Sequence, residues 1–169
     1  MAGMAAALVM GLFAMVWAAT SGLGLYSPLY QVTAVVEPGP LGVSLREAAE
    51  GWRYYFEVGP AAAGLAVHLA IGGGFGAVFA LVARAIRLHG WVAVAAGAAY
   101  GLAVGGLMGL VVIPLAADET AGGQVVADAP RLLGWPVFAV EHLLYGLTLG
   151  LLAFRGEERQ PYAAQQPKR

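Results

Sequence analysis

At residues 68–76 the sequence reads His68-Leu69-Ala70-Ile71-Gly72-Gly73-Gly74-Phe75-Gly76, and at 142–150 it reads His142-Leu143-Leu144-Tyr145-Gly146-Leu147-Thr148-Leu149-Gly150. Both stretches follow the pattern H-L-x-x-G-x-x-x-G inside a long apolar run. Positions four residues apart share one face of an α-helix. Each copy is therefore predicted to place one imidazole and two glycines in a single stripe, once in each half of the chain.

The composition is that of a protein dissolved in lipid. Of the 169 residues, 60% are hydrophobic and 11% are charged, whereas soluble domains carry roughly a quarter charged residues. A helix needs about 20 apolar residues to cross a bilayer core. Four stretches meet this requirement, at residues 4–21, 60–83, 91–116 and 135–154. The sequence thus predicts an all-α polytopic membrane protein with four transmembrane helices, which form one domain over residues 1–155.

The distribution of charge predicts the orientation. No Lys or Arg precedes the first apolar stretch, so we interpret it as a retained helix rather than a secretory signal. An N-inside start leaves six cations on the cytoplasmic side: Arg84, Arg87, Arg155, Arg159, Lys168 and Arg169. The positive-inside rule then predicts a bacterial inner-membrane protein with both termini cytoplasmic. Residues 156–169 are polar and are expected to form a disordered cytoplasmic tail.

The longest segment between spans, residues 22–59, has two parts. Its first part is rich in Gly and Pro, which predicts an extended or irregular course. Ser44 followed by Glu47 matches a capping box, so we expect a short helix over 44–56. This helix contains an aromatic cluster, Trp52, Tyr54, Tyr55 and Phe56. Such a helix would lie in the outer membrane interface as an anchor; a lid over a binding site or a partner contact is the alternative.

Small residues predict close contacts between helices. The third span carries glycine at every fourth position, at Gly97, Gly101, Gly105 and Gly109. Such a face lets a neighbouring backbone approach closely. Pro114, near the outer end of the same span, is expected to kink or terminate the helix.

A weaker match between the halves suggests an internal repeat. Gly3 is followed after six residues by Met10-Gly11-Leu12, and Gly101 is followed after six residues by Met108-Gly109-Leu110. Together with the two H-L-x-x-G-x-x-x-G copies, this predicts two helical hairpins of the same orientation. They would be related by a pseudo-twofold axis along the membrane normal.

Two runs resemble the YagU-like group of small bacterial inner-membrane proteins. They are the H-L-x-Y-G-L-x-L-G run at 142–150 and the Gly-Leu pairs at 101–102 and 109–110 that precede Pro114-Leu115. The similarity covers most of the membrane-spanning part but not residues 22–59. That group has no established activity. The resemblance therefore implies a four-helix membrane fold and no catalytic residue.

The two histidines allow three hypotheses. They could be the axial ligands of a haem b, with room for the macrocycle beside Gly72, Gly76, Gly146 and Gly150 and with Phe75, Tyr100 and Tyr145 lining the pocket. They could instead hydrogen-bond across helices to a carbonyl, a Thr or each other. The third hypothesis is a path for protons or small molecules.

Glu141 is a carboxylate inside a predicted span, which by default marks a functional site. It is adjacent to His142 and therefore points about 100° away from it. We expect it to pair with Arg131 or Arg53 near the outer surface, or to accept a hydrogen bond from Tyr145, four residues on. The functional alternative is a proton-accepting group.

These observations favour a non-catalytic membrane protein, an accessory or structural subunit of a larger membrane complex with a role in electron transfer. A bis-histidine haem b carrier and a small transporter or channel are the alternatives. The chain has no cysteine, no nucleophile motif and no cluster of metal ligands. The expected partners are the bilayer and other membrane subunits or further copies of the chain, without nucleic acid.

Overall fold

A computed structural model describes residues 1–120 and 122–158, and within this part the chain forms helices and no strand. Four long apolar helices are present, which confirms the predicted number of helices that are long and apolar enough to span a membrane. They are α1 (Ala2–Thr20), α4 (Val58–Ala85), α5 (Gly90–Leu107) with its continuation, and α9 (Trp135–Glu158). Helix α9 continues past the predicted end of the domain at residue 155. The remainder of the predicted tail, 159–169, lies outside the described residues.

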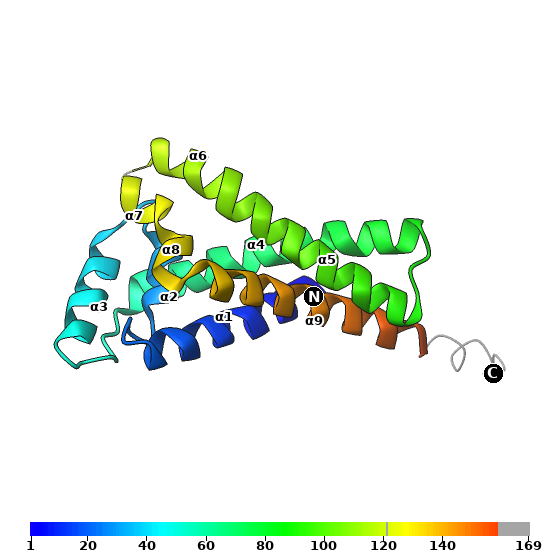
Figure 1. Ribbon diagram of the computed structural model, residues 1–169, viewed down its shortest axis with the longest axis horizontal. Coiled ribbons are helices and arrows are strands. Elements are labelled where there is room, and N and C mark those ends of the chain that lie inside the picture. Colours follow the sequence, from blue (N-terminus) through cyan, green and yellow to red (C-terminus); the bar gives the residue numbers. More distant parts are fainter. Residues whose placement is uncertain (121, 159–169) are drawn as a thin grey trace, which may run out of the picture.

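Short helices cluster at one end of this bundle (Figure 1). We call this end the cap; it consists of residues 21–57 and of the segment from 119 to 134, apart from residue 121. It contains α2 (Ser27–Thr33), α3 (Gly39–Ala49), α7 (Gly123–Ala127) and α8 (Ala129–Leu133). The turn between α4 and α5 lies at the opposite end. In the bundle, α1 packs against α4 and α9, and α5 packs along α9, whereas α4 makes little contact with α5.

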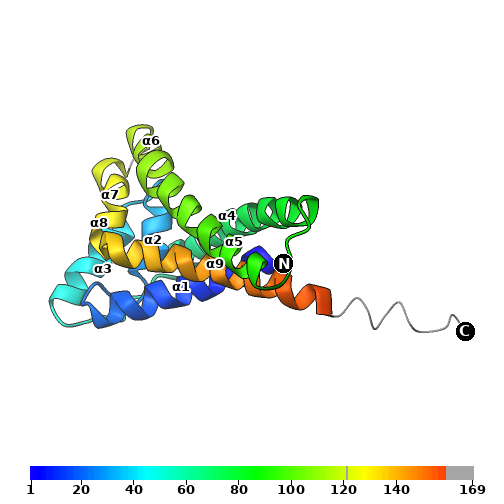
Figure 2. The same cartoon turned by 45° about the vertical axis from the view of Figure 1, so that its right-hand side comes forward.

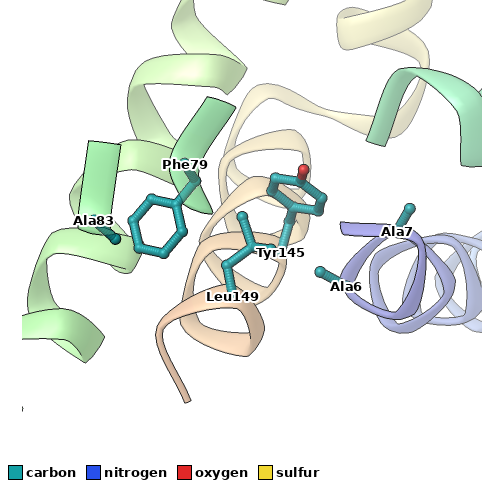
Figure 3. Packing of buried hydrophobic residues seen from close by; sticks show 6 residues of the cluster. All are labelled: Ala6, Ala7, Phe79, Ala83, Tyr145 and Leu149. Atoms are coloured by element: carbon teal, nitrogen blue, oxygen red, sulfur yellow. The ribbon is translucent and has the colours of Figure 1, made fainter. Parts of the chain in front are cut away.

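The centre of the bundle is a small apolar core beside the interface of three helices. Tyr145 and Leu149 of α9 lie between Phe79 of α4 on one side and Ala6 and Ala7 of α1 on the other (Figure 3). All five residues are buried. Most other large apolar side chains on the four helices are exposed, as expected where lipid is the surrounding solvent.

Glycines bring the helices of each close pair into backbone contact. A Cβ on Gly3 of α1 would overlap the carbonyl oxygen of Gly72 on α4, and a Cβ on Gly76 would overlap the Cα of Gly3. In the other pair, a Cβ on Gly146 of α9 would overlap the carbonyl oxygen of Gly97 on α5. The predicted close packing at these glycines is confirmed, since no side chain fits between the paired backbones.

The cap differs from the sequence-based prediction in two places. Helix α2 forms where an irregular course was expected, because Pro28 occupies its first turn, a position in which proline favours a helix. Helix α3 begins at Gly39, five residues before Ser44. The predicted capping box is therefore wrong: Ser44 lies inside the helix, and its Oγ is 2.9 Å from the Oγ of Ser27 on α2.

The aromatic cluster does not lie on a helix. Helix α3 ends at Ala49, and Gly51 follows in a left-handed conformation with φ 98°, which glycine adopts without steric cost. The predicted helical course over 50–56 is therefore wrong. Trp52, Tyr54 and Phe56 are exposed on the loop that leads into α4.

Pro114 does not terminate its helix. Helix α5 passes into a π-helical segment, η1 (Met108–Val112), and continues as α6 (Ile113–Asp118). Proline has no N–H to donate to the preceding turn, and a π-helical turn is one way to accommodate that loss. Both views show α6 leaning away from α9 at the cap (Figures 1 and 2).

The phenol of Tyr30 on α2 ties the cap to the start of α4, and we expect its removal to destabilise the protein. The ring is fully buried, and the hydroxyl accepts a 2.7 Å hydrogen bond from the backbone N–H of Glu57. We expect Tyr30→Phe to lower the free energy of unfolding by about 1 kcal/mol. The variant is measured by titrating SDS into mixed micelles, and Tyr54→Phe, on an exposed ring, serves as the unchanged control.

The contribution of Tyr30 should also depend on pH. Burial raises the pKa of Tyr30 above its usual value of 10, so ionisation favours the unfolded state. Its stabilising effect should be complete below pH 10 and decline as the pH rises above that value. The stability of Tyr30→Phe should then fall less steeply above pH 10 than that of the wild type. An equal decline in both proteins would contradict this assignment.

Candidate functional site

A cavity of about 510 Å³ lies inside the bundle near the cap. Its walls come from α1, α4, the α5–η1–α6 helix and α9, and residues of α2, α7 and α8 line its cap end. The walls are mostly apolar. Four ionisable side chains interrupt them: His68, Glu141, His142 and Tyr145. Predicted site residues from both halves are thus brought together in one cavity, whereas Gly76, Tyr100, Gly146 and Gly150 do not line it.

His68 on α4 forms a hydrogen bond across the helix pair. Its Nε2 donates to the carbonyl oxygen of Ala7 on α1, at 2.9 Å. Gly11, one turn further along α1, provides the space for this ring, because a Cβ there would lie 3.2 Å from Nε2. For His68 the hypothesis of an interhelical hydrogen bond to a carbonyl is confirmed.

His142 on α9 bonds within its own helix instead. Its Nδ1 donates to the carbonyl oxygen of Phe138 at 2.8 Å, and the two rings lie 4.4 Å apart between centroids. Gly105 of α5 leaves room for the imidazole. A neutral imidazole with its proton on Nδ1 carries an acceptor at Nε2. This nitrogen remains available to the cavity.

Glu141 has no partner of the predicted kind. The side chain is 2% exposed, lines the cavity, and its Oε1 is buried without a hydrogen-bond partner. Arg131 pairs with Asp128 at 3.2 Å, and Arg53 donates to the carbonyl oxygen of Ala19. Both expected ion pairs are therefore absent. Glu141 and His142 line the same cavity although they are neighbours in sequence, because the cavity is wide enough to meet two adjacent positions of α9.

Tyr145 also differs from its predicted role. Its hydroxyl donates to the carbonyl oxygen of Gly72 on α4, at 2.5 Å, rather than to Glu141. Tyr100 on α5 donates similarly to the carbonyl oxygen of Phe75, at 2.7 Å. Phe75 and Tyr145 line the cavity as predicted, whereas Tyr100 packs on the apolar core. The two phenols thus join α4 to the opposite helix pair.

The glycines of the repeated motif serve helix packing. Gly72 borders the cavity, but a Cβ on it would lie 2.5 Å from that of Ala7. Gly76, Gly146 and Gly150 are occupied in the same way by the backbone of a neighbouring helix. The space beside these glycines is therefore already filled, and it leaves no room there for a macrocycle.

The geometry does not fit a haem held by both histidines. A haem ligand must offer a free ring nitrogen to the iron, and the Nε2 of His68 is hydrogen-bonded to a carbonyl. No Lys or Arg occurs among the described residues that line the cavity, so haem propionates would have no cationic partner there. His142 alone has the arrangement of an axial ligand, with Nδ1 hydrogen-bonded and Nε2 free.

One cavity residue was not predicted. Gln31 on α2 lines the cap end of the cavity, and its Nε2 is buried without a hydrogen-bond partner. The sequence signal was present, because Gln31 and Thr33 are two polar residues within the apolar stretch from Leu29 to Val36. It was missed because that segment was expected to be irregular rather than a helix with one face toward the bundle.

The cavity has a side opening toward the surrounding lipid. Val36 (79%), which follows α2 in the cap, is an exposed lining residue. On the spanning helices the exposed lining residues are Ala63, Val67 (45%) and Ile71 (42%) on α4, and Val112 (37%) on η1. They come from the two helices that make little contact with each other. An apolar molecule dissolved in the bilayer could therefore reach the cavity between α4 and η1.

Comparisons with protein-family models, curated proteins and solved structures find no match to this chain.

Proposed function

We propose that the protein binds a small lipid-soluble molecule in the cavity between its membrane-spanning helices. The observation that carries this proposal is Glu141, a buried side chain that lines an apolar cavity and whose Oε1 has no hydrogen-bond partner. A buried polar atom without a partner costs free energy. Proteins retain such groups inside membranes chiefly where a ligand, ion or proton uses them.

The dimensions of the cavity support the proposal. Ligand sites are typically concave, mostly apolar and about 300–1,000 Å³ in volume, with a few polar groups that orient the ligand. This cavity, of about 510 Å³, has that character, with Glu141, His142 and Gln31 as its polar groups. The side opening between Val67 and Val112 gives a route from the bilayer. The function is thus binding or carriage rather than catalysis, and it is closest to the transporter hypothesis.

Photolabelling tests the proposal directly. The full-length protein is placed in phosphatidylcholine nanodiscs with a decanol analogue that carries a photoreactive diazirine, and labelled residues are mapped by mass spectrometry. We expect saturable labelling of cavity-lining residues that excess unlabelled decanol prevents. Ala116→Phe, which fills the cavity from α6, should abolish the saturable labelling. Ala103→Phe, on an exposed position of α5 outside the cavity, is the matched control.

Competition distinguishes binding from partition into lipid. Labelling that rises in proportion to probe concentration, with equal intensity on the lipid-facing surface, would contradict a binding site. Unchanged labelling in Ala116→Phe would place the site elsewhere.

We also propose that the two halves arose by duplication, with a register one turn different from the sequence match. The contacts of Gly3 with Gly72 and Gly76 are repeated by those of Gly97 with Gly146 and Gly150. Gly11 faces His68 as Gly105 faces His142. These pairs support an alignment of Gly3 with Gly97, rather than with Gly101, and an arrangement as two parallel hairpins.

For the cellular setting, we propose a bacterial inner membrane with both termini cytoplasmic, because Arg84 and Arg87 lie at the turn between α4 and α5, opposite the cap, whereas carboxylates outnumber arginines in the cap. We propose further that the protein delivers its ligand to, or holds it for, a larger membrane complex. The exposed apolar faces of the four helices are compatible with such a partner. Affinity purification in mild detergent tests that association.

A further inference from the structure

In the described part of the chain, the cavity is lined by an acidic side chain without a basic Lys or Arg to balance it. Glu141 is its single carboxylate, and the described lining residues include no Lys or Arg. In a medium of low dielectric constant an unpaired charge interacts strongly with any opposite charge that approaches it. A cationic ligand would therefore pair with the ionised form of Glu141, which burial without a partner disfavours, whereas an anionic ligand would find no cation among the described wall residues to pair with.

Both histidines add acceptors to the same cavity. The Nε2 of His68 and the Nδ1 of His142 donate to backbone carbonyls, so in the neutral rings the other nitrogen of each is an acceptor. The hydroxyl of Tyr145 also donates its proton to a carbonyl. The polar groups of the spanning helices consequently present electron pairs rather than protons to a ligand. Gln31, on α2, is the one amide donor, and it lies at the cap end.

Aromatic rings form part of the wall. Phe75 of α4 and Phe138 and Tyr145 of α9 line the cavity together with Glu141. The faces of aromatic rings attract cations, and the attraction is strongest in sites that exclude water. A carboxylate together with several rings is the combination that recognises an organic cation with an apolar body.

The cap adds a field of the same sign around this end of the molecule. The cap carries three arginines. Seven carboxylates lie in the cap or, in the case of Asp118, immediately beside it: Glu37, Glu47, Glu50, Glu57, Asp118, Glu119 and Asp128. An excess of one sign of charge raises the local concentration of ligands of the opposite sign.

We infer from these features that the ligand is a lipophilic cation, such as an alkylammonium, whose charged group lies at Glu141 and whose apolar part fills the cavity. This inference rests on the proposed binding function and names its ligand class. The apolar body enters from the bilayer between α4 and η1. The charge is then held by the carboxylate and by the ring faces.

A pair of probes of equal shape tests the ligand class. Decyltrimethylammonium and its neutral isostere, in which a tert-butyl group replaces the trimethylammonium, compete against the photoreactive decanol on the full-length protein in nanodiscs. We expect the cation to compete at a concentration at least about tenfold lower than the isostere, and decanoate to compete least. Glu141→Gln keeps the shape of the side chain and removes its charge. It should abolish the preference for the cation and leave competition by the isostere unchanged.

The outcomes separate the two proposals. Equal competition by the cation and the isostere in the wild type would overturn the cation assignment while the binding function stands, and this comparison needs no variant. A preference for the cation that survives in Glu141→Gln would also overturn it. Absence of saturable labelling with any probe would overturn both proposals.

Discussion

Gly146→Ala should separate α5 from α9 and lower the free energy of unfolding by about 3 kcal/mol or more. The added methyl group would overlap the carbonyl oxygen of Gly97 and would lie 2.8 Å from the backbone N of Gly101. Backbone atoms cannot move aside as a flexible side chain can, so the helices must part along their length. The measurement is unfolding in mixed micelles by SDS, followed by circular dichroism.

The chain offers matched controls for this substitution. Gly74 on α4 and Gly106 on α5 also lie inside helices, but a Cβ on either would meet nothing within 4 Å. Gly74→Ala and Gly106→Ala should therefore change stability by no more than about 1 kcal/mol, and in the stabilising direction, because alanine favours a helix more than glycine does. Equal losses in all three variants would show that the loss in Gly146→Ala does not come from the contact with α5, because helix propensity alone favours alanine.

Glu141→Leu should stabilise the folded protein, by about 1–3 kcal/mol, while it abolishes the preference of the cavity for a cation. The carboxylate is buried with its Oε1 unpartnered, so the folded state carries a cost that leucine does not. Binding sites commonly lower the stability of the folded protein, because their polar groups lack a partner until the ligand binds. The same SDS titration gives the sign of the change, and competition between decyltrimethylammonium and its neutral isostere in the photolabelling assay gives the loss of the preference.

Tyr145→Phe provides the contrast on the same helix face. It removes the hydrogen bond to Gly72 and should cost about 1 kcal/mol, which shows that the assay detects the loss of one polar contact. A decrease in stability with Glu141→Leu would contradict the assignment of an unpartnered carboxylate. It would mean that Glu141 supports the fold through a contact that leucine cannot replace.

The membrane-spanning helices could be predicted because the properties that determine them belong to short, continuous stretches of sequence. Length and hydropathy fix where a helix crosses, and the i+4 glycines fix which faces approach each other. Gly3, Gly97 and Gly146 meet neighbouring backbones as that rule expects. His68 and His142, which occupy the same position of a repeated motif, both line one cavity, although a haem held by both does not fit there.

The cap and the pairing of polar groups could not be predicted in this way. Pro28 initiates a helix although the same residue in another context marks a turn, and the difference depends on the packing of α2 against α4. Ser44 matched a capping pattern but bonds to Ser27, which is distant in sequence. Arg131 could reach Glu141 or Asp128 by charge alone. Only the fold shows that it pairs with Asp128 and leaves the carboxylate of α9 to the cavity.

The two helix pairs that pack through glycine contacts, α1 with α4 and α5 with α9, can assemble in a defined order. Helices α1 and α4 precede α5 in the chain, and their backbones meet where Gly3 contacts Gly72 and Gly76. During synthesis this pair can therefore close before α5 leaves the ribosome, as N-terminal units generally do. The second pair then closes on its own glycines. The last step joins finished halves, when the hydroxyl of Tyr145 reaches Gly72, and only this step encloses the cavity.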